Sequence, residues 1–274
     1  MGFNGTAGVW RREAIVDAGG WGIDTLTEDL DLAMRAQLAG WKLRYLDELA
    51  APAELPESIP AIRSQQFRWM KGGAQVARKV LATIWKSPIP LKIKLQATAH
   101  LGSPCIWLVI LTGVVMGPIL LHVHAVVPWA ASLMLPIGIF FQAVVVTTLL
   151  VSYATTSIVR TGSVGRGLGR ACIEVPLLQS FCLALSVQNS VAVLEGFFGE
   201  TGTFVRTPKS GGTGKSAASS IAARYSSNPL VTSAELALAA WGIVGIGMSI
   251  SIGNYAALPW FVTQTVGLVL IHKL

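Results

Sequence analysis

Three short motifs in this 274-residue sequence bring together carboxylate, aromatic and basic side chains that could do chemistry. The first is Thr27-Glu28-Asp29, in which Asp29 could act as a general base on a sugar hydroxyl, with Glu28 beside it. A purely structural explanation is also complete, because a threonine N-cap followed by two carboxylates stabilises the start of a helix. At this point both explanations stay open.

The second motif is Gln65, Arg68 and Trp69, in the string Gln65-Gln66-Phe67-Arg68-Trp69. Arg68 offers paired N–H donors that suit a phosphate, and Trp69 offers a flat apolar face for a sugar ring. Gln65 lies about one helical turn earlier and adds a neutral donor and acceptor. The alternative is an Arg–Trp pair that anchors a helix among lipid headgroups.

The third motif is Phe204-Val205-Arg206-Thr207-Pro208-Lys209, in a polar segment between two apolar parts of the chain. Taken alone, this string is a basic loop. It becomes informative through its place, because it follows the other two motifs and is separated from them by the most apolar part of the sequence.

The polar N-terminal part is predicted to mix helices and strands. Helices are expected at 11–18 and 26–39, each followed by glycine. Strands are expected at 6–10 and at 41–45, where apolar and charged residues alternate. A proline-marked loop follows at 52–60. This pattern predicts part of an α/β sheet but not all of one.

The charges divide the chain into a polar part and a membrane part. Residues 1–96 hold 23 of the 35 Asp, Glu, Lys and Arg residues, and 97–274 hold the other 12. From Leu95 to Val159 there is no charged side chain over 65 residues, although about 20 apolar residues suffice to span a bilayer. With 52% hydrophobic and 13% charged residues, the chain is neither a soluble globule nor disordered.

Membrane spans are expected at roughly 97–121, 125–151, 232–252 and 255–272. Before them, the basic amphipathic helix Ala61–Trp85 is expected to lie in the membrane interface. The segment 172–198 is expected to lie along the inner leaflet instead of crossing. This arrangement places every cluster of Lys and Arg on the cytoplasmic side, as the positive-inside rule requires.

The order of the three motifs, together with the apolar segments between them, resembles the processive family 2 glycosyltransferases. These are the membrane synthases of cellulose, mannan, glucomannan and related polymers. The resemblance also rests on the strings 3–12, 18–21, 40–42 and 189–199. The first of these strings looks most like the plant-type mannan synthases and their bacterial relatives.

The resemblance implies a role for each motif. Asp29 matches the general base that deprotonates the terminal hydroxyl of the acceptor. Gln65, Arg68 and Trp69 match the motif at the end of the acceptor channel, with Trp69 on the terminal sugar and Arg68 facing the nucleotide diphosphate. Arg206 stands where cellulose synthases typically have valine, which leaves the exact loop contacts open. The residues that match the gating loop over the nucleotide sugar are Phe204, Thr207 and Lys209.

The resemblance also implies the reaction and its partners. The full-length enzyme would be an inverting hexosyltransferase that uses a nucleotide-diphospho-sugar (UDP- or GDP-hexose) and a polysaccharide acceptor. It would move the polymer across the lipid bilayer from a multi-pass position in the plasma (inner) membrane, with its catalytic side cytoplasmic. No nucleic-acid partner is expected, because most of the basic excess lies just before the first apolar segment, where lipid headgroups are the natural partner.

Members of the family hold the nucleotide sugar and a divalent cation, Mg²⁺ or Mn²⁺, with aspartates that include an Asp-x-Asp motif. Asp29-Leu30-Asp31 has this spacing, but its first aspartate is the predicted base. We therefore expect that the metal ligands are absent from this chain, that it is a C-terminal portion of a longer enzyme, and that alone it transfers no sugar. The alternative is a non-catalytic membrane remnant, or a split-synthase or transport subunit.

These expectations give a fold class of α/β plus membrane α-helical: a partial Rossmann-like (GT-A) domain, an interfacial helix and about four transmembrane helices. The expected divisions are 1–60 for the C-terminal part of the GT-A domain, 61–96 for the interface helix, 97–151 for a transmembrane hairpin, 152–198 for a cytoplasmic loop and interfacial helix, 199–229 for the gating-type loop and 230–274 for a second transmembrane hairpin.

Overall fold

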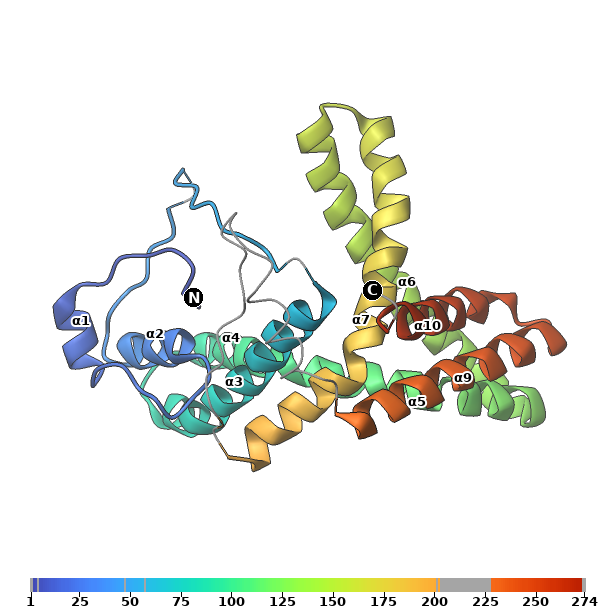
Figure 1. Cartoon of the computed structure of the whole chain (residues 1–274), viewed down its shortest axis with the longest axis horizontal. Coiled ribbons are helices and arrows are strands. Elements are labelled where there is room, and N and C mark those ends of the chain that lie inside the picture. Colours follow the sequence, from blue (N-terminus) through green and yellow to red (C-terminus); the bar gives the residue numbers. More distant parts are fainter. Residues whose placement is uncertain are drawn as a thin grey trace. The chain divides into compact units, whose positions relative to one another are not determined.

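The computed structural model describes residues 2–3, 5–46, 48–56, 58–200, 202 and 228–272. Regular structure in these residues is helical throughout. The chain divides into two compact units, Met1–Val109 with Gln188–Asn228, and Ile110–Val187 with Pro229–Leu274. We call them the polar unit and the apolar unit. Figure 1 shows the helices of both.

The helices below belong to the polar unit and lie within the residues that the structure describes. They are α1 (Arg12–Asp17), α2 (Glu28–Leu38), α3 (Ile59–Lys86), α4 (Leu91–Leu101), the short 3-10 helix η1 (Ser103–Cys105) and the last part of α7 (Val164–Phe198). Helix α3 begins at Ser58, whose Oγ accepts a hydrogen bond from the backbone N–H of Ala61 at 3.4 Å. Pro60 follows in the first turn, where its missing N–H is not needed.

The core of the polar unit is shared by helices α2, α3 and α4. Its buried side chains are Met34, Val76, Ala77, Val80, Ile84 and Leu101. Phe197, near the end of α7, packs against the same cluster. Burial of this apolar surface is what holds α2 on α3, since hydrophobic contact supplies most of the stability of short helices.

The helices predicted at 11–18 and 26–39 are confirmed as α1 and α2. The strands predicted at 6–10 and 41–45 are wrong, because both segments are irregular. A strand requires a neighbouring strand to pair its backbone groups, and the described part of the chain offers none. Trp41 instead packs against the buried Leu32 and Ala36 and donates its Nε1–H to Asp17 at 3.1 Å. The Rossmann-like sheet is therefore not seen in these residues.

The apolar unit holds the membrane-type helices α5 (Ile106–Val126), α6 (Pro128–Thr161), the first part of α7, α9 (Pro229–Ser251), the 3-10 helix η2 (Tyr255–Ala257) and α10 (Leu258–Leu270). Within the described part of the chain, four segments are long and apolar enough to cross a membrane: Ser103–Val126, Ala143–Thr161, Val164–Phe198 and Pro229–Ser251.

Four spans were predicted, as many as these segments, but the helices that form them are different. Residues 97–101 belong to α4, and η1 separates them from the first apolar helix. Helix α7 is a single 35-residue helix of membrane-spanning length. By contrast, α10 has 13 residues, or about 20 Å, which is short of a bilayer core of about 30 Å.

Candidate functional site

Asp29 lies in the first turn of α2, next to Glu28. Its Oδ1 accepts a hydrogen bond from the backbone N–H of Leu30 at 2.8 Å. The backbone at Gly5 covers the other oxygen, because a Cβ at this position would come within 2.6 Å of Asp29 Oδ2. Gly5 also has φ +69°, which favours glycine. The segment around residue 5 thus shields the carboxylate from solvent.

This shielding raises the pKa of Asp29 above its usual value. Burial is the largest cause, and the negative charge of Glu28 adds to it. The Leu30 N–H and the positive charge of Arg68 oppose the shift without cancelling it. Two consequences follow. The carboxylate is a better proton acceptor than an exposed aspartate, and Arg68 of α3 lies within electrostatic range of it.

One face of α3 holds the start of α2. Arg68, Gly72, Gln75 and Lys79 are spaced four, three and four residues apart, so they form one stripe along the helix. A Cβ at Gly72 would lie 2.9 Å from the backbone nitrogen of Thr27, so the two backbones are in close contact. The side chain of Gln75 accepts a hydrogen bond from the backbone N–H of Leu26 at 2.9 Å.

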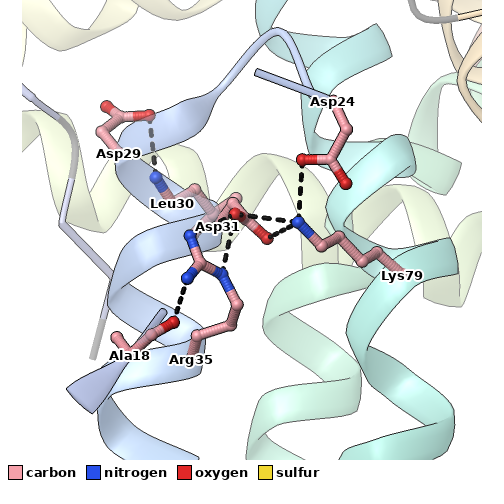
Figure 2. Close-up of polar contacts among 7 residues, drawn as sticks. All are labelled: Ala18, Asp24, Asp29, Leu30, Asp31, Arg35 and Lys79. Atoms are coloured by element: carbon pink, nitrogen blue, oxygen red, sulfur yellow. Dashed lines mark hydrogen bonds and ion pairs between the residues drawn. The ribbon is translucent and has the colours of Figure 1, made fainter. Parts of the chain in front are cut away.

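Lys79 completes this docking through ion pairs, which Figure 2 shows. Its Nζ lies 3.0 Å from Oδ1 and 3.1 Å from Oδ2 of Asp31, and 2.8 Å from Oδ1 of Asp24. Arg35 binds Asp31 Oδ2 through Nε at 2.9 Å and Nη2 at 2.7 Å, and its Nη1 donates to the carbonyl of Ala18. Asp31 is fully buried, so it depends on these cations.

The ion pairs at Asp31 bear on whether Asp29 and Asp31 could bind a divalent cation together. In Figure 2 the two carboxylates point in different directions, as expected for positions two apart on a helix. Asp31 is already occupied by Arg35 and Lys79, which would repel a cation. Among the described residues, no group of three or more His, Cys, Asp and Glu could hold a metal. Asp29 and Asp31 therefore do not fit a divalent cation.

The other predicted site residues lie in the first half of α3 or outside the described residues. Gln65 is half-buried, and Trp69 has 42% of its surface exposed. Trp69 lies about 100° around the helix from Arg68, so it presents its ring beside the docking stripe rather than within it. The remaining candidates, Phe204, Thr207 and Lys209, fall in a segment that the structure does not describe.

Another side of α3 contacts the end of α7. Lys71 Nζ lies 2.8 Å from Glu195 Oε2, and the Arg63 Nε–H donates to Gln188 at 2.6 Å. A Cβ at Gly196 would come within 2.5 Å of the carbonyl oxygen of Lys71, so the two helices nearly touch. Two of the basic residues of the predicted interface helix are therefore bonded inside the protein. Glu195, an acidic residue near the end of the apolar helix α7, thus has Lys71 as its partner.

Sequence reasoning missed Lys79 and Gln75 as residues that position α2. Their spacing from Arg68 could have indicated this, because it places them on the same face of the helix as Arg68. It also missed the buried Glu235 of α9, whose Oε2 lies 3.1 Å from Nε2 of His272 in the apolar unit. An acidic residue inside an apolar helix marks such a position by itself.

Comparisons with known proteins give a consistent family. The model of the "Glycosyl transferase family group 2" matches residues 2–159. Glucomannan 4-beta-mannosyltransferase 7 of Arabidopsis thaliana is 43% identical over 143 residues, which cover 48% of this chain and 25% of that protein. Glucomannan 4-beta-mannosyltransferase 1 of Oryza sativa subsp. japonica is 50% identical over 94 residues, covering 31% and 18% respectively.

A third relative, glucomannan 4-beta-mannosyltransferase 2 of Arabidopsis thaliana, is 52% identical over 84 residues, which cover 31% of this chain and 16% of that protein. The chain thus spans about a quarter or less of the length of the curated relatives it matches. No solved structure matches it.

Proposed function

Because this chain belongs to glycosyl transferase family group 2, whose model matches residues 2–159, we propose that it carries the acceptor side of a membrane β-glycosyltransferase. The reaction transfers a hexose from a nucleotide-diphospho-sugar to the end of a polysaccharide of the cellulose or mannan type, and the polymer then crosses the bilayer. The relatives are glucomannan 4-beta-mannosyltransferases, which makes mannose the first sugar to test.

The observation that carries this proposal is the shielded carboxylate of Asp29 at the start of α2, within electrostatic range of Arg68 on α3. In the proposed step, Asp29 takes the proton of the acceptor hydroxyl while the hydroxyl oxygen attacks the anomeric carbon. The bond from that carbon to the diphosphate breaks, and the diphosphate leaves with the bonding electrons. Its negative charge is stabilised by Arg68.

The neighbouring motif residues have supporting roles in the same proposal. The exposed ring of Trp69 packs on the terminal sugar, and Gln65 binds its hydroxyl groups. Glu28 keeps the pKa of Asp29 raised through its negative charge. The loop residues that close over the nucleotide sugar are Phe204, Thr207 and Lys209.

The same proposal divides the chain between a catalytic domain and a membrane part. Residues 1–60 belong to a GT-A-type, Rossmann-like catalytic domain, and 61–96 lead from it to the membrane surface. The helices beyond them cross the plasma membrane, with the catalytic side in the cytoplasm. The four apolar segments of spanning length support the membrane position, and the grouping of basic residues on one side supports the orientation.

The proposal is tested by sugar transfer in membranes that contain the natural gene product. GDP-mannose and UDP-glucose are supplied with a radioactive sugar, and the polymer is identified by digestion with β-mannanase or cellulase. We expect Asp29→Asn to lower the rate by about 10²- to 10⁴-fold, since a general base contributes this much. Glu13→Gln changes an exposed carboxylate in the first turn of α1 and serves as the matched control.

Two results would contradict the proposal. If the Asp29→Asn variant makes polymer at the normal rate, Asp29 is not the base. If the unaltered protein transfers neither sugar, a non-catalytic membrane role takes the place of the enzyme.

A further inference from the structure

We propose that Lys79 and Asp31 are positioning residues that fix the first turn of α2, and with it Asp29, against α3. This inference rests on the proposed function, because it concerns the residue to which that function gives the role of base. Neither residue touches the reacting groups in this scheme. Both act through the placement of the helix that carries Asp29.

The first step of the argument is the place of the two carboxylates that meet at Lys79. Asp24 precedes the N-cap Thr27 by three residues, and Asp31 follows it by four. Both reach the same ammonium group, Asp24 at 2.8 Å and Asp31 at 3.0 Å. Lys79 therefore holds the chain on both sides of the Thr27-Glu28-Asp29 motif and ties it to α3, as Figure 2 shows.

The second step is the energetic weight of the contact at Asp31. This side chain is fully buried, and a buried carboxylate without a partner is strongly destabilising. Helix α2 can rotate or slide on α3 only by pulling Asp31 away from Lys79. Desolvation alone would lower the pKa of Lys79, but its bonds to Asp24 and Asp31 outweigh this and leave the pKa raised. Lys79 therefore stays charged at neutral pH.

The third step is the register between the two helices. Gly72 contacts Thr27, Gln75 binds the N–H of Leu26 and Lys79 binds Asp31, so three successive points of one α3 stripe are attached to α2. Arg68 is the next position of that stripe, about one turn before Gly72. The attachment that fixes α2 on the stripe therefore also fixes Asp29 relative to Arg68.

The variant Lys79→Met separates this role from a general loss of structure. It removes the ion pairs between Lys79 and the α2 segment but leaves the apolar core of α2 and α3 in place and Asp31 paired with Arg35 on its own helix. Asp24 loses its contact with Lys79 too, but more than half of its side chain is exposed to solvent. Two matched variants complete the set: Lys79→Arg keeps a cation at this position, and Asp24→Asn keeps the pair between Lys79 and Asp31.

Steady-state sugar transfer is measured for the natural gene product in membranes, together with the amount of folded protein from limited trypsin digestion. We expect Lys79→Met to lower kcat by about 10- to 100-fold per folded molecule, because displacement of a reacting group by about 1 Å can have this effect. KM for the sugar nucleotide stays near its normal value. Lys79→Arg restores most of kcat. Asp24→Asn lowers kcat less than Lys79→Met does, because it leaves the pair between Lys79 and Asp31 and an amide oxygen that can still accept a hydrogen bond from Lys79.

The inference is overturned if Lys79→Met has a normal kcat, or if its loss of activity only follows its loss of folded protein. It is also overturned if Lys79→Arg is as inactive as Lys79→Met. A failure of the proposed function looks different. In that case the unaltered protein transfers no sugar, or Asp29→Asn is fully active.

Discussion

At the scale of single residues, the burial that suits Asp29 to its proposed role as a base also destabilises its charged form. The backbone near Gly5 shields its carboxylate, and burial raises its pKa. The folded protein therefore binds a proton at this position more tightly than the unfolded chain does. The contribution of this group to stability is fully present below its unfolded pKa and is lost as the pH rises through its folded pKa.

The raised pKa of Asp29 predicts that Asp29→Asn stabilises the protein at neutral pH while it removes activity. The amide has no charge to desolvate, so the variant avoids the unfavourable term that the carboxylate brings. We expect a higher apparent Tm than the unaltered protein at pH 7, and a smaller difference near pH 4. Thermal unfolding in detergent at both values measures this. A lower Tm for the variant at pH 7 would mean that the carboxylate is stabilising and that its pKa is not raised.

The sequence located the candidate residues better than it explained their surroundings. Asp29 and Arg68 are parts of short motifs, and motifs can be read from a chain without its fold. The partners of Asp31 could not be foreseen in the same way. Arg35 lies four residues away on the same helix, but Lys79 is 48 positions away and is brought near only by the packing of α2 on α3.

At the scale of elements, α3 acts as a scaffold with two sides. One stripe, from Gly72 to Lys79, holds the start of α2, and another side meets the end of α7 through Lys71 and Arg63. The sequence predicted this helix and its basic amphipathic character. It did not predict that cations at Arg63 and Lys71 are bonded within the protein, because their partners Gln188 and Glu195 are more than 120 residues away.

The contact between α3 and α7 predicts unequal effects for two glycines of the same helix. A Cβ at Gly196 would come within 2.5 Å of the Lys71 carbonyl and 2.6 Å of the Ala74 Cβ, whereas one at Gly165 would meet no atom within 4 Å. Gly196→Ala should therefore lower the stability of the polar unit by about 1–3 kcal/mol. Gly165→Ala should be neutral or slightly stabilising, since alanine favours helix.

Thermal unfolding in detergent, with trypsin cleavage to follow the polar unit, measures both variants side by side. Equal stability of the two would show that the close approach of α7 to Lys71 does not exist in solution.

At the scale of the whole molecule, the course of α7 relative to the membrane follows from its length and from the contacts of its last part. Its 35 residues are about 52 Å long, which is more than a bilayer core needs. Nevertheless, its last part belongs to the polar unit, where Glu195 and Gln188 bind α3. Since α3 precedes the first apolar helix, we expect the end of α7 on the same side of the membrane as α3.

The start of α7 is expected on that same side. Helices α5 and α6 are joined through the single residue Val127, which suits a hairpin that crosses and returns. The positive-inside rule predicts the cytoplasmic side for Arg160, Arg166 and Arg170, near the turn from α6 to α7. We therefore predict that both ends of α7 share one side of the membrane.

This topology predicts the labelling of single cysteines. Cys105, Cys172 and Cys182 are first replaced by serine or alanine, and one cysteine is then introduced at Ser163, Glu200 or His124. We expect a membrane-impermeant maleimide to label Ser163→Cys and Glu200→Cys from the cytoplasmic side and His124→Cys from the opposite side, in vesicles of known orientation. Ser163→Cys and Glu200→Cys lie at the two ends of α7 and together test its course. Labelling of Glu200→Cys from the His124 side would mean that α7 crosses the membrane, and that its end cannot meet α3 as the ion pair between Lys71 and Glu195 requires.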